Sequence, residues 1–194
     1  MCNLYRLTSS LEAMRRLFGV HAGGLPNLPA MPEIYPGQTV PVVRDTPAGR
    51  RPELMRWGFP PPPAAGARLV TNVRNLASPF WRTALTRPDR RCLVPADAFA
   101  EWDGPPGARR KRWFEVDGGR TFAFAGLWRP LEGGEGTAMA FLTCAPNALV
   151  AAIHPKAMPV ILDPADYGTW LDAPVEAACA LAAPFPAQRM RLLD

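Results

Sequence analysis

Short apolar runs separated by glycine, proline and polar residues recur along the chain, and this spacing predicts a protein made mainly of strands. Asp117-Gly118-Gly119 separates two of these runs and is typical of the tight turn of a β-hairpin. Two segments rich in glycine and proline, residues 23–38 and 60–66, are expected to be loops. The strands are expected at residues 3–8, 40–44, 54–59, 69–73, 91–94, 98–102, 112–116, 121–128, 138–143 and 159–162.

Helical spacing of apolar residues appears in fewer places. Met14, Leu17 and Phe18 recur at helical intervals after Ser9-Ser10-Leu11-Glu12, which has the spacing of a capping box, and Gly19 is a plausible end. Ser78-Pro79 is typical of a helix start and predicts a helix through residue 85. Further helices are expected at residues 147–153, 164–171 and 174–183.

These elements together indicate an α+β fold, with an antiparallel, barrel-like β-sheet core and peripheral helices. The sequence shows no internal repeat, no heptad pattern and no linker with a shift in composition. A chain of 194 residues is long enough to bury a core of its own. We therefore expect a single domain spanning residues 1–194.

The charge balance changes this picture little. The chain has 22 Lys and Arg against 17 Asp and Glu, a net charge of +5, and Lys111 and Lys156 are its only lysines. Arginine binds phosphate through a fixed fork, so this surface is compatible with nucleic acid. Codon usage in a GC-rich genome would raise arginine, alanine, proline and glycine together and explains the same excess.

Several function classes are disfavoured. No apolar run approaches the ~20 residues of a membrane span, and the start does not resemble a signal peptide, so we expect a cytoplasmic protein that does not bind membranes. Four cysteines without a CxxC pair and two histidines form no zinc pattern, and no metal or cofactor is expected. Phosphate-loop, GxSxG and HExxH motifs are absent from the sequence.

Cys2 offers chemistry that no other position can. It is small enough for methionine aminopeptidase to remove Met1, which would leave an α-amine and a thiol on adjacent carbons. The α-amine has a reference pKa of about 7.7–8.0, so part of it is neutral at physiological pH and can form a Schiff base with an aldehyde. The thiol can then add to the imine carbon and close a thiazolidine ring. The alternative is a packed cysteine with no chemical role.

Two titratable residues could move protons. His154 lies at a break between an apolar helix and a strand, where an imidazole can act as a proton shuttle near neutral pH or can simply be structural. Glu101 lies at a strand end beside an aromatic residue, where desolvation would raise the pKa of its carboxyl. The alternative for Glu101 is an outward-facing strand position.

Asn72 and Arg74 alternate along a predicted strand and are expected to share one face. An amide can orient a substrate, and a guanidinium can hold a phosphate. The alternative is an ordinary exposed strand face.

Taken together, these segments resemble the SOS response-associated peptidase (SRAP) family, whose members sense and shield abasic sites in single-stranded DNA. Each motif alone is modest, and the ordered set is specific. The matching segments are Met1-Cys2, 57–60 (WGFP), 72–74 (NVR), 78–82 (SPFWR), 90–96 (RRCLVPA), Glu101-Trp102, 124–128 (FAGLW), Thr143, His154 and 158–162 (MPVIL).

The resemblance implies roles for individual residues. Cys2 would be the nucleophile that links to the ring-opened abasic aldehyde, Asn72 would position the terminal residue or the sugar, and Glu101 and His154 would transfer protons. The expected DNA contacts come from a smaller set whose members lie around that centre: Arg74, Lys156, Trp57 and Pro36.

The resemblance also implies a monomer that binds single-stranded DNA with abasic sites and gathers at the nucleoid after damage. It implies possible lyase activity and self-cleavage before Cys2. The chain departs from many members at Asn3-Leu4, where they have Gly-Arg, at residues 60–63, where prolines replace a Trp-rich segment, and at the C-terminus, where relatives usually continue.

Two other functions stay open. One is a peptidase or amidase in which Cys2, His154 and Asn72 form a thiol–imidazole–amide set. The other is a non-catalytic module that binds single-stranded nucleic acid through arginine and tryptophan alone.

Overall fold

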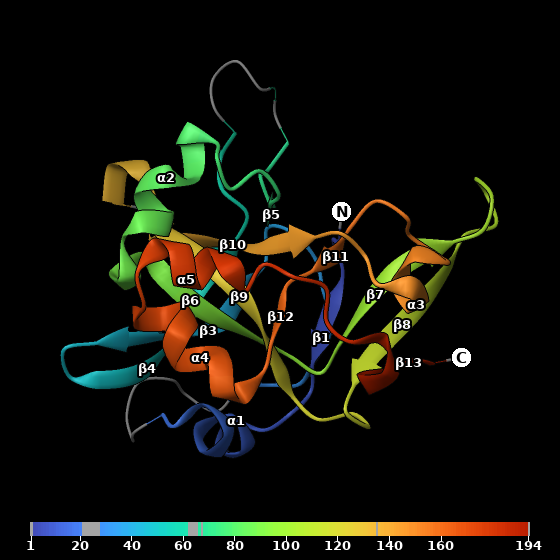
Figure 1. Cartoon of the computed structure of the whole chain (residues 1–194), viewed down its shortest axis with the longest axis horizontal. Coiled ribbons are helices and arrows are strands. Elements are labelled where there is room, and N and C mark those ends of the chain that lie inside the picture. The colour runs from blue at the N-terminus through green and yellow to red at the C-terminus, as the bar shows by residue number, and fades with distance from the viewer. Residues whose placement is uncertain (1, 21–27, 62–65, 67, 135, 194) are drawn as a thin grey trace.

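The expected α+β class is confirmed: two largely antiparallel sheets dominate the fold, and short helices lie around them (Figure 1). A computed structural model of the chain describes all residues except 1, 21–27, 62–65, 67, 135 and 194. In the described parts, no helix combines the length and the apolar character needed to traverse a bilayer.

The smaller sheet has five strands in the order β13-β8-β7-β1-β2. Its strands are β1 (Tyr5–Leu7), β2 (Met31–Ile34), β7 (Ala98–Asp103), β8 (Arg110–Val116) and β13 (Met190–Leu193). Strands β1 and β7 run antiparallel, with Tyr5 opposite Phe99. The N-terminal segment therefore follows the edge of β7, and this pairing brings it to the site described below.

The larger sheet has eight strands and closes into a ring, because β9 pairs with β10 as well as with β6. Its strands are β3 (Thr39–Thr46), β4 (Gly49–Trp57), β5 (Asn72–Val73), β6 (Arg91–Ala96), β9 (Phe122–Pro130), β10 (Thr137–Cys144), β11 (Met158–Pro159) and β12 (Ile161–Leu162). Aromatic rings fill the interior, with Tyr5, Trp57, Phe124 and Phe141 all buried and in mutual contact. Strands this apolar are expected where both faces are covered.

Close packing between β6 and β9 depends on one glycine. A Cβ at Gly126 would lie 2.7 Å from the Cys92 sulfur and 2.8 Å from a Val94 methyl group. Contacts this short do not occur between real side chains, so only glycine allows the two strands to approach here. This explains the glycine within an otherwise bulky strand sequence.

The hairpin predicted at Asp117-Gly118-Gly119 is wrong. The turn exists, and all three residues have positive φ values of 47°, 73° and 91°. However, β8 pairs with β7 and β13, whereas β9 pairs with β6, β10 and β12. The turn therefore carries the chain from one sheet to the other, because local turn chemistry does not specify long-range strand partners.

Other expectations changed at their edges. Strand β2 lies within the segment expected to be a loop, and β13 was not expected at all. The strand expected at residues 69–73 shortens to β5, preceded by an isolated bridge between Phe59 and Val70. Residues 62–65 of the second expected loop lie outside the described residues.

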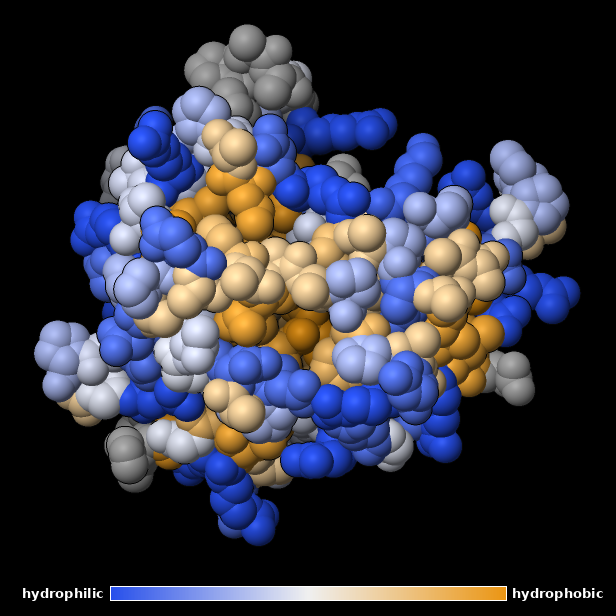
Figure 2. Space-filling model, in the orientation of Figure 1, coloured by the Kyte–Doolittle hydropathy of each residue, from blue (hydrophilic) through white to orange (hydrophobic). Residues whose placement is uncertain are grey.

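The helices are α1 (Leu11–Phe18), α2 (Pro79–Thr86), α3 (Ala148–Ala151), α4 (Tyr167–Asp172) and α5 (Val175–Ala180), with four 3-10 turns at residues 88–90, 132–134, 164–166 and 187–189. The Ser10 side chain caps α1 by accepting from the Ala13 amide, and Gly19 ends the helix in the left-handed region. Ser9, a member of the expected capping box, instead binds Asp97. Apolar residues gather over α5 on the face shown in Figure 2, with hydrophilic residues around them.

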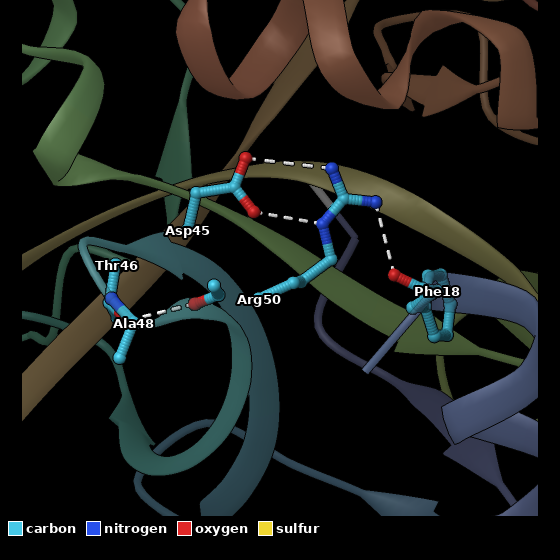
Figure 3. A network of polar contacts seen from close by, with 6 residues as sticks. Phe18, Asp45, Thr46, Ala48 and Arg50 are labelled. Carbon is cyan, nitrogen blue, oxygen red and sulfur yellow. Dashed lines mark hydrogen bonds and ion pairs between the residues drawn. The ribbon is translucent and has the colours of Figure 1, made fainter. Parts of the chain in front are cut away.

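Two arginines tie helices to the ring. Figure 3 shows Arg50 donating to both carboxylate oxygens of Asp45 and, at 3.0 Å, to the carbonyl of Phe18 at the end of α1. Arg91 is almost fully buried and donates to three carbonyls, those of Leu85, Trp170 and Ala173. Because these carbonyls end α2 and α4, the guanidinium satisfies acceptors that the helices leave open.

Candidate active site

Cys2 lies at the junction of the two sheets and is completely buried. Its thiol donates a hydrogen bond to the carbonyl of Leu4 at 3.5 Å. Burial raises the pKa of the thiol well above its usual range, and the nearby carboxylate of Glu101 raises it further. At neutral pH this side chain is therefore a thiol and not a thiolate.

Glu101 reaches the same junction from β7. The strand lies beside the N-terminal segment, since the Ala100 amide donates to the Leu4 carbonyl at 2.9 Å. The carboxyl is buried, and its Oε1 atom has no hydrogen-bond partner among the described residues. Desolvation raises the pKa of this carboxyl to about 7, in the direction that its sequence position suggests.

His154 faces Glu101 from the segment between α3 and β11. Its Nε2 atom lies 3.7 Å from Oε2 of Glu101. The backbone amide of His154 donates to the Val150 carbonyl at 2.7 Å, and Asn147 caps α3. The short helix therefore fixes the backbone position from which the imidazole projects. Burial lowers the pKa of His154, and Lys156 nearby lowers it further, so the imidazole is neutral at pH 7.

Asn72 comes from β5, which runs parallel to β10 with Asn72 opposite Phe141. Its side-chain amide donates to the Thr71 carbonyl at 3.0 Å, while its Oδ1 atom is buried and has no partner among the described residues. The Thr71 hydroxyl in turn donates to the Asn3 side chain at 3.1 Å. This chain of contacts joins β5 directly to the segment that carries Cys2.

Trp57 requires a correction. Its ring has no exposed surface and packs against Tyr5 and Phe141 in the core. The structure places this ring in the aromatic core and not at the surface, where the expected contact with flanking DNA would lie. Its Nε1–H donates to the Thr71 carbonyl at 3.1 Å, and the tryptophan thus supports the strand that presents Asn72.

The remaining expected contacts lie at the surface. Arg74 and Lys156 are exposed, and Pro36 is half-buried in the turn between β2 and β3. Arg74 is exposed whereas Asn72 is buried, and β5 ends at Val73, one residue before Arg74. The charge of Arg74 still lies close enough to Cys144 to lower the pKa of that thiol, against the larger effect of burial.

Thr143 is a polar residue of this region to which no role was assigned from the sequence. It is buried on β10, and its hydroxyl has no hydrogen-bond partner among the described residues. It points to the same side of the strand as Phe141, which contacts Tyr5 just after the N-terminal segment. A hydroxyl at the end of an apolar strand run is the signal that could have identified it.

The arrangement is a small, buried polar cluster built from both sheets. Buried polar atoms without partners are rare in folded proteins, and here Asn72, Glu101 and Thr143 each have one. Such atoms can accept hydrogen bonds from a polar ligand, and the carboxyl of Glu101 can also exchange a proton with it. Within the parts of the chain that the structure describes, no three His, Cys, Asp or Glu side chains gather closely enough to hold a metal ion.

Comparison with known proteins identifies relatives of the whole chain. The family model described as SOS response associated peptidase (SRAP) matches residues 1–194. The abasic site processing protein YoqW of Bacillus subtilis is 28% identical over 184 residues, which cover 89% of this chain and 80% of the relative. The abasic site processing protein YobE of the same organism is also 28% identical, over 89% of this chain and 82% of its own length.

Solved structures resemble the whole fold. A crystal structure of a protein from Bordetella bronchiseptica matches with a TM-score of 0.81 and 27% identity, over 98% of each chain. A protein from Bacteroides thetaiotaomicron matches with a TM-score of 0.84 over 98% of this chain and 90% of its own, at 18% identity. The second likeness concerns the fold alone.

Proposed function

Because the chain belongs to the SOS response associated peptidase family, we propose that it processes abasic sites in DNA by capturing them covalently through Cys2. Two relatives are named abasic site processing proteins, which supports this substrate class. The proposal requires removal of Met1, which exposes the α-amine of Cys2. We treat residues 1–194 as one domain that acts as a monomer in the cytoplasm and gathers at the nucleoid after damage.

The placement of Cys2 beside the contacting pair of Glu101 and His154 is the observation that carries this proposal. A thiol–imidazole peptidase needs a thiolate beside a protonated histidine. Here burial raises the pKa of the Cys2 thiol and lowers that of His154, so both groups stay neutral. A neutral thiol does not start the reaction, whereas a neutral terminal amine does, and this favours imine chemistry over the peptidase alternative.

The reaction then runs in two balanced steps. The Cys2 amine attacks the open-chain aldehyde of the abasic sugar, and loss of one water leaves an imine. The S–H bond adds across the C=N bond, so that sulfur bonds to carbon and its proton ends on nitrogen. The product is a thiazolidine, formed with the net loss of one water. Removal of a C2′ proton from the imine, before ring closure, would form a C2′=C3′ double bond as the 3′ phosphate leaves, and this β-elimination would give the lyase activity that the resemblance implies.

Glu101 and His154 supply the proton transfers. A carboxyl with a pKa of about 7 is partly protonated at neutral pH, so it can protonate the ring oxygen of the sugar and later accept a proton. The neutral imidazole 3.7 Å away can exchange that proton. Asn72 and Thr143 have free acceptor atoms that suit the hydroxyl groups of an opened sugar.

Contacts to DNA phosphates come from the exposed charges beside the cluster. Arg74 and Lys156 lie at the surface next to the buried residues, and Pro36 borders the segment after β2. Phosphate contacts provide affinity without sequence choice and weaken with salt. Arg74→Gln is expected to weaken binding to all sequences and to reduce the salt slope by about 1.

The test is a denaturing gel with protein that lacks Met1 and a single-stranded oligonucleotide carrying one abasic site. A shifted band that survives denaturation supports the proposal, and undamaged DNA or a site reduced to its alcohol gives no band. Cys2→Ser removes the band, because an alcohol does not close a thiazolidine. Cys179→Ser, at a half-buried cysteine on α5, is the matched control and keeps it.

The other outcomes separate the alternatives. A Cys2→Ala variant that still gives the stable band contradicts covalent capture through this residue. Unchanged DNA association without any adduct, in the original protein and in Cys2→Ala, indicates the non-catalytic binding module. Cleavage of a peptide bond other than Met1–Cys2 indicates the peptidase if that cleavage depends on both Cys2 and His154.

A further inference from the structure

A separate hollow of about 520 Å³ lies between α2 and the end of β9. It borders the helix labelled α2 in Figure 1. Its floor is apolar, and its rim carries arginines. The lining residues are Pro79, Phe80, Thr83, Ala84, Arg87, Arg90, Arg129, Pro130, Leu131 and Glu132.

Arg129 is the central cation of this hollow. Its guanidinium lies 4.2 Å from the ring centre of Phe80 and 4.6 Å from that of Phe59. Burial lowers the pKa of Arg129, although a guanidinium stays charged at neutral pH. Among the described residues no carboxylate comes within 4.0 Å of it, so its charge is available to a ligand.

Arg90 and Arg87 add charge at the opposite side. Arg90 lies 4.6 Å over the Trp128 ring, and its Nη1 atom is buried without a hydrogen-bond partner among the described residues. Both arginines share the carboxylate of Asp89, which lies 3.8 Å from Arg90 and 2.6 Å from Arg87. Glu132 in the lining and Asp89 beside it are the acidic groups that accompany the three arginines, so positive charge exceeds negative charge by one.

We propose that this hollow binds an acidic peptide segment of a partner protein. An apolar side chain of the peptide fills the hollow, and its carboxylates pair with Arg129 and Arg90, since Arg87 is already held by Asp89. Carboxylates match the planar fork of arginine, and a partly desolvated fork strengthens the pairing.

A peptide suits this site better than a nucleic acid. Arg129, Phe59 and Trp81 already pack around Phe80, so its ring forms a wall of the hollow and not a platform on which a base could stack. The arginines could hold a phosphate, but the apolar lining residues Pro79, Ala84, Pro130 and Leu131 offer nothing to a sugar or to a base edge. A hydrophobic anchor beside carboxylates uses both parts of the lining.

The hollow is also offset from the Cys2 site along β10. On β10, Ala138 lies opposite Arg129, and Phe141 lies opposite Asn72. Three residues of a strand span about 10 Å. The hollow and the Cys2 site are thus different places along β10.

The test measures fluorescence anisotropy of the labelled peptide Gly-Asp-Asp-Glu-Leu-Phe with the full chain. Saturable binding is expected, weakened by replacing the peptide's phenylalanine with alanine and lost when its acidic residues become lysines. No saturation at up to about 1 mM peptide overturns the proposal. Displacement of the peptide by equally low concentrations of an undamaged oligonucleotide also overturns it, because the occupant would then be nucleic acid.

Variants locate the binding. Arg129→Gln is expected to raise the dissociation constant about tenfold, since it removes a charge-assisted bond. Thr83→Glu places a carboxylate in the hollow without disturbing the Phe80 packing and is expected to weaken binding as much. Arg82→Gln, on an exposed position of α2 outside the lining, is the matched control and leaves affinity unchanged.

Equal binding by Thr83→Glu and the original protein contradicts the proposed location. All three variants are expected to capture abasic DNA at the original rate. The peptide result and the DNA result are therefore independent, and failure of one does not imply failure of the other.

Discussion

Two buried carboxyl groups on the same stretch of chain behave in opposite ways. Asp97 precedes β7 and Glu101 lies on it, and they are only 8% and 4% exposed. Asp97 accepts five hydrogen bonds from the backbone and side chains of Thr8 and Ser9 and from the Thr121 hydroxyl. Glu101 has one oxygen with no partner among the described residues.

The difference shows that hydrogen bonds decide whether the pKa of a buried carboxyl falls or rises. Burial acts to raise the pKa of Asp97, but its hydrogen bonds outweigh that effect and the pKa is lowered. For Glu101 the effect of burial prevails, and the pKa rises to about 7. The satisfied carboxylate holds the start of α1 to the sheets, and the unsatisfied one remains available to a substrate.

The largest expected effect separates catalysis from stability at Glu101. Glu101→Gln keeps the shape of the side chain but removes its proton transfer, so the rate of abasic-site capture should fall by about 10²–10⁴. The free energy of unfolding should stay the same or increase at pH 8, where the native carboxylate is ionised. Single-turnover capture and urea unfolding measure the two quantities. A capture rate that Glu101→Gln leaves unchanged would remove Glu101 from the mechanism.

Asp97→Ala should show the reverse. It leaves five donors without their acceptor and is expected to lower the free energy of unfolding by about 4 kcal/mol. Capture per folded molecule should be unchanged, because Asp97 lies outside the Cys2 cluster. Denaturant titration and capture at low temperature check both parts. A loss of capture in molecules that remain folded would contradict the division between the two carboxyl groups.

The same contrast should appear in the pH dependence of stability. Because the folded pKa of Glu101 is raised, its contribution is fully present below about pH 4.5 and is lost as pH rises through about 7, by up to about 3 kcal/mol. Because the folded pKa of Asp97 is lowered, its contribution is present above its unfolded pKa and is lost as pH falls through the folded value. Unfolding curves of Glu101→Gln and the original protein from pH 4 to 8 should diverge accordingly. Parallel curves would show that burial does not perturb Glu101.

The smallest expected effect comes from removing a single hydrogen bond to Asp97. Thr121→Val preserves the side-chain shape and removes one of the five hydrogen bonds to Asp97. The free energy of unfolding should fall by about 1 kcal/mol, and the pKa of Asp97 should rise. NMR titration of the Asp97 carboxyl carbon measures the shift. An unchanged pKa would mean that the other four bonds alone hold it low.

The sequence singled out several residues of the cluster but not how they are placed. Cys2 and Glu101 could be singled out because an N-terminal aminothiol and a carboxyl near aromatic residues are local features. The role of Trp57 could not, because whether a tryptophan is buried depends on strands far away in sequence. The hydrogen bonds to Asp97 were missed for the same reason, since Thr8 and Thr121 are separated by more than one hundred residues.

The fold shows the same limit. Most strands were visible as apolar runs, whereas β2 was hidden among prolines and the turn at residues 117–119 was assigned to a hairpin. Strand pairing is set by the packing of whole faces, which local propensity does not contain. The ring closure of β9 on β10 therefore needed the structure.

Mass spectrometry of the adduct tests the central claim most directly. Protein without Met1, mixed with an oligonucleotide bearing one abasic site, should give a species equal to the sum of both masses minus one water. Digestion should place the added sugar on Cys2, and the adduct should be unchanged by borohydride, which reduces an imine but not a thiazolidine. An adduct on any other residue, or a Cys2 adduct that gains two hydrogens with borohydride, would contradict capture by the terminal amine and thiol together.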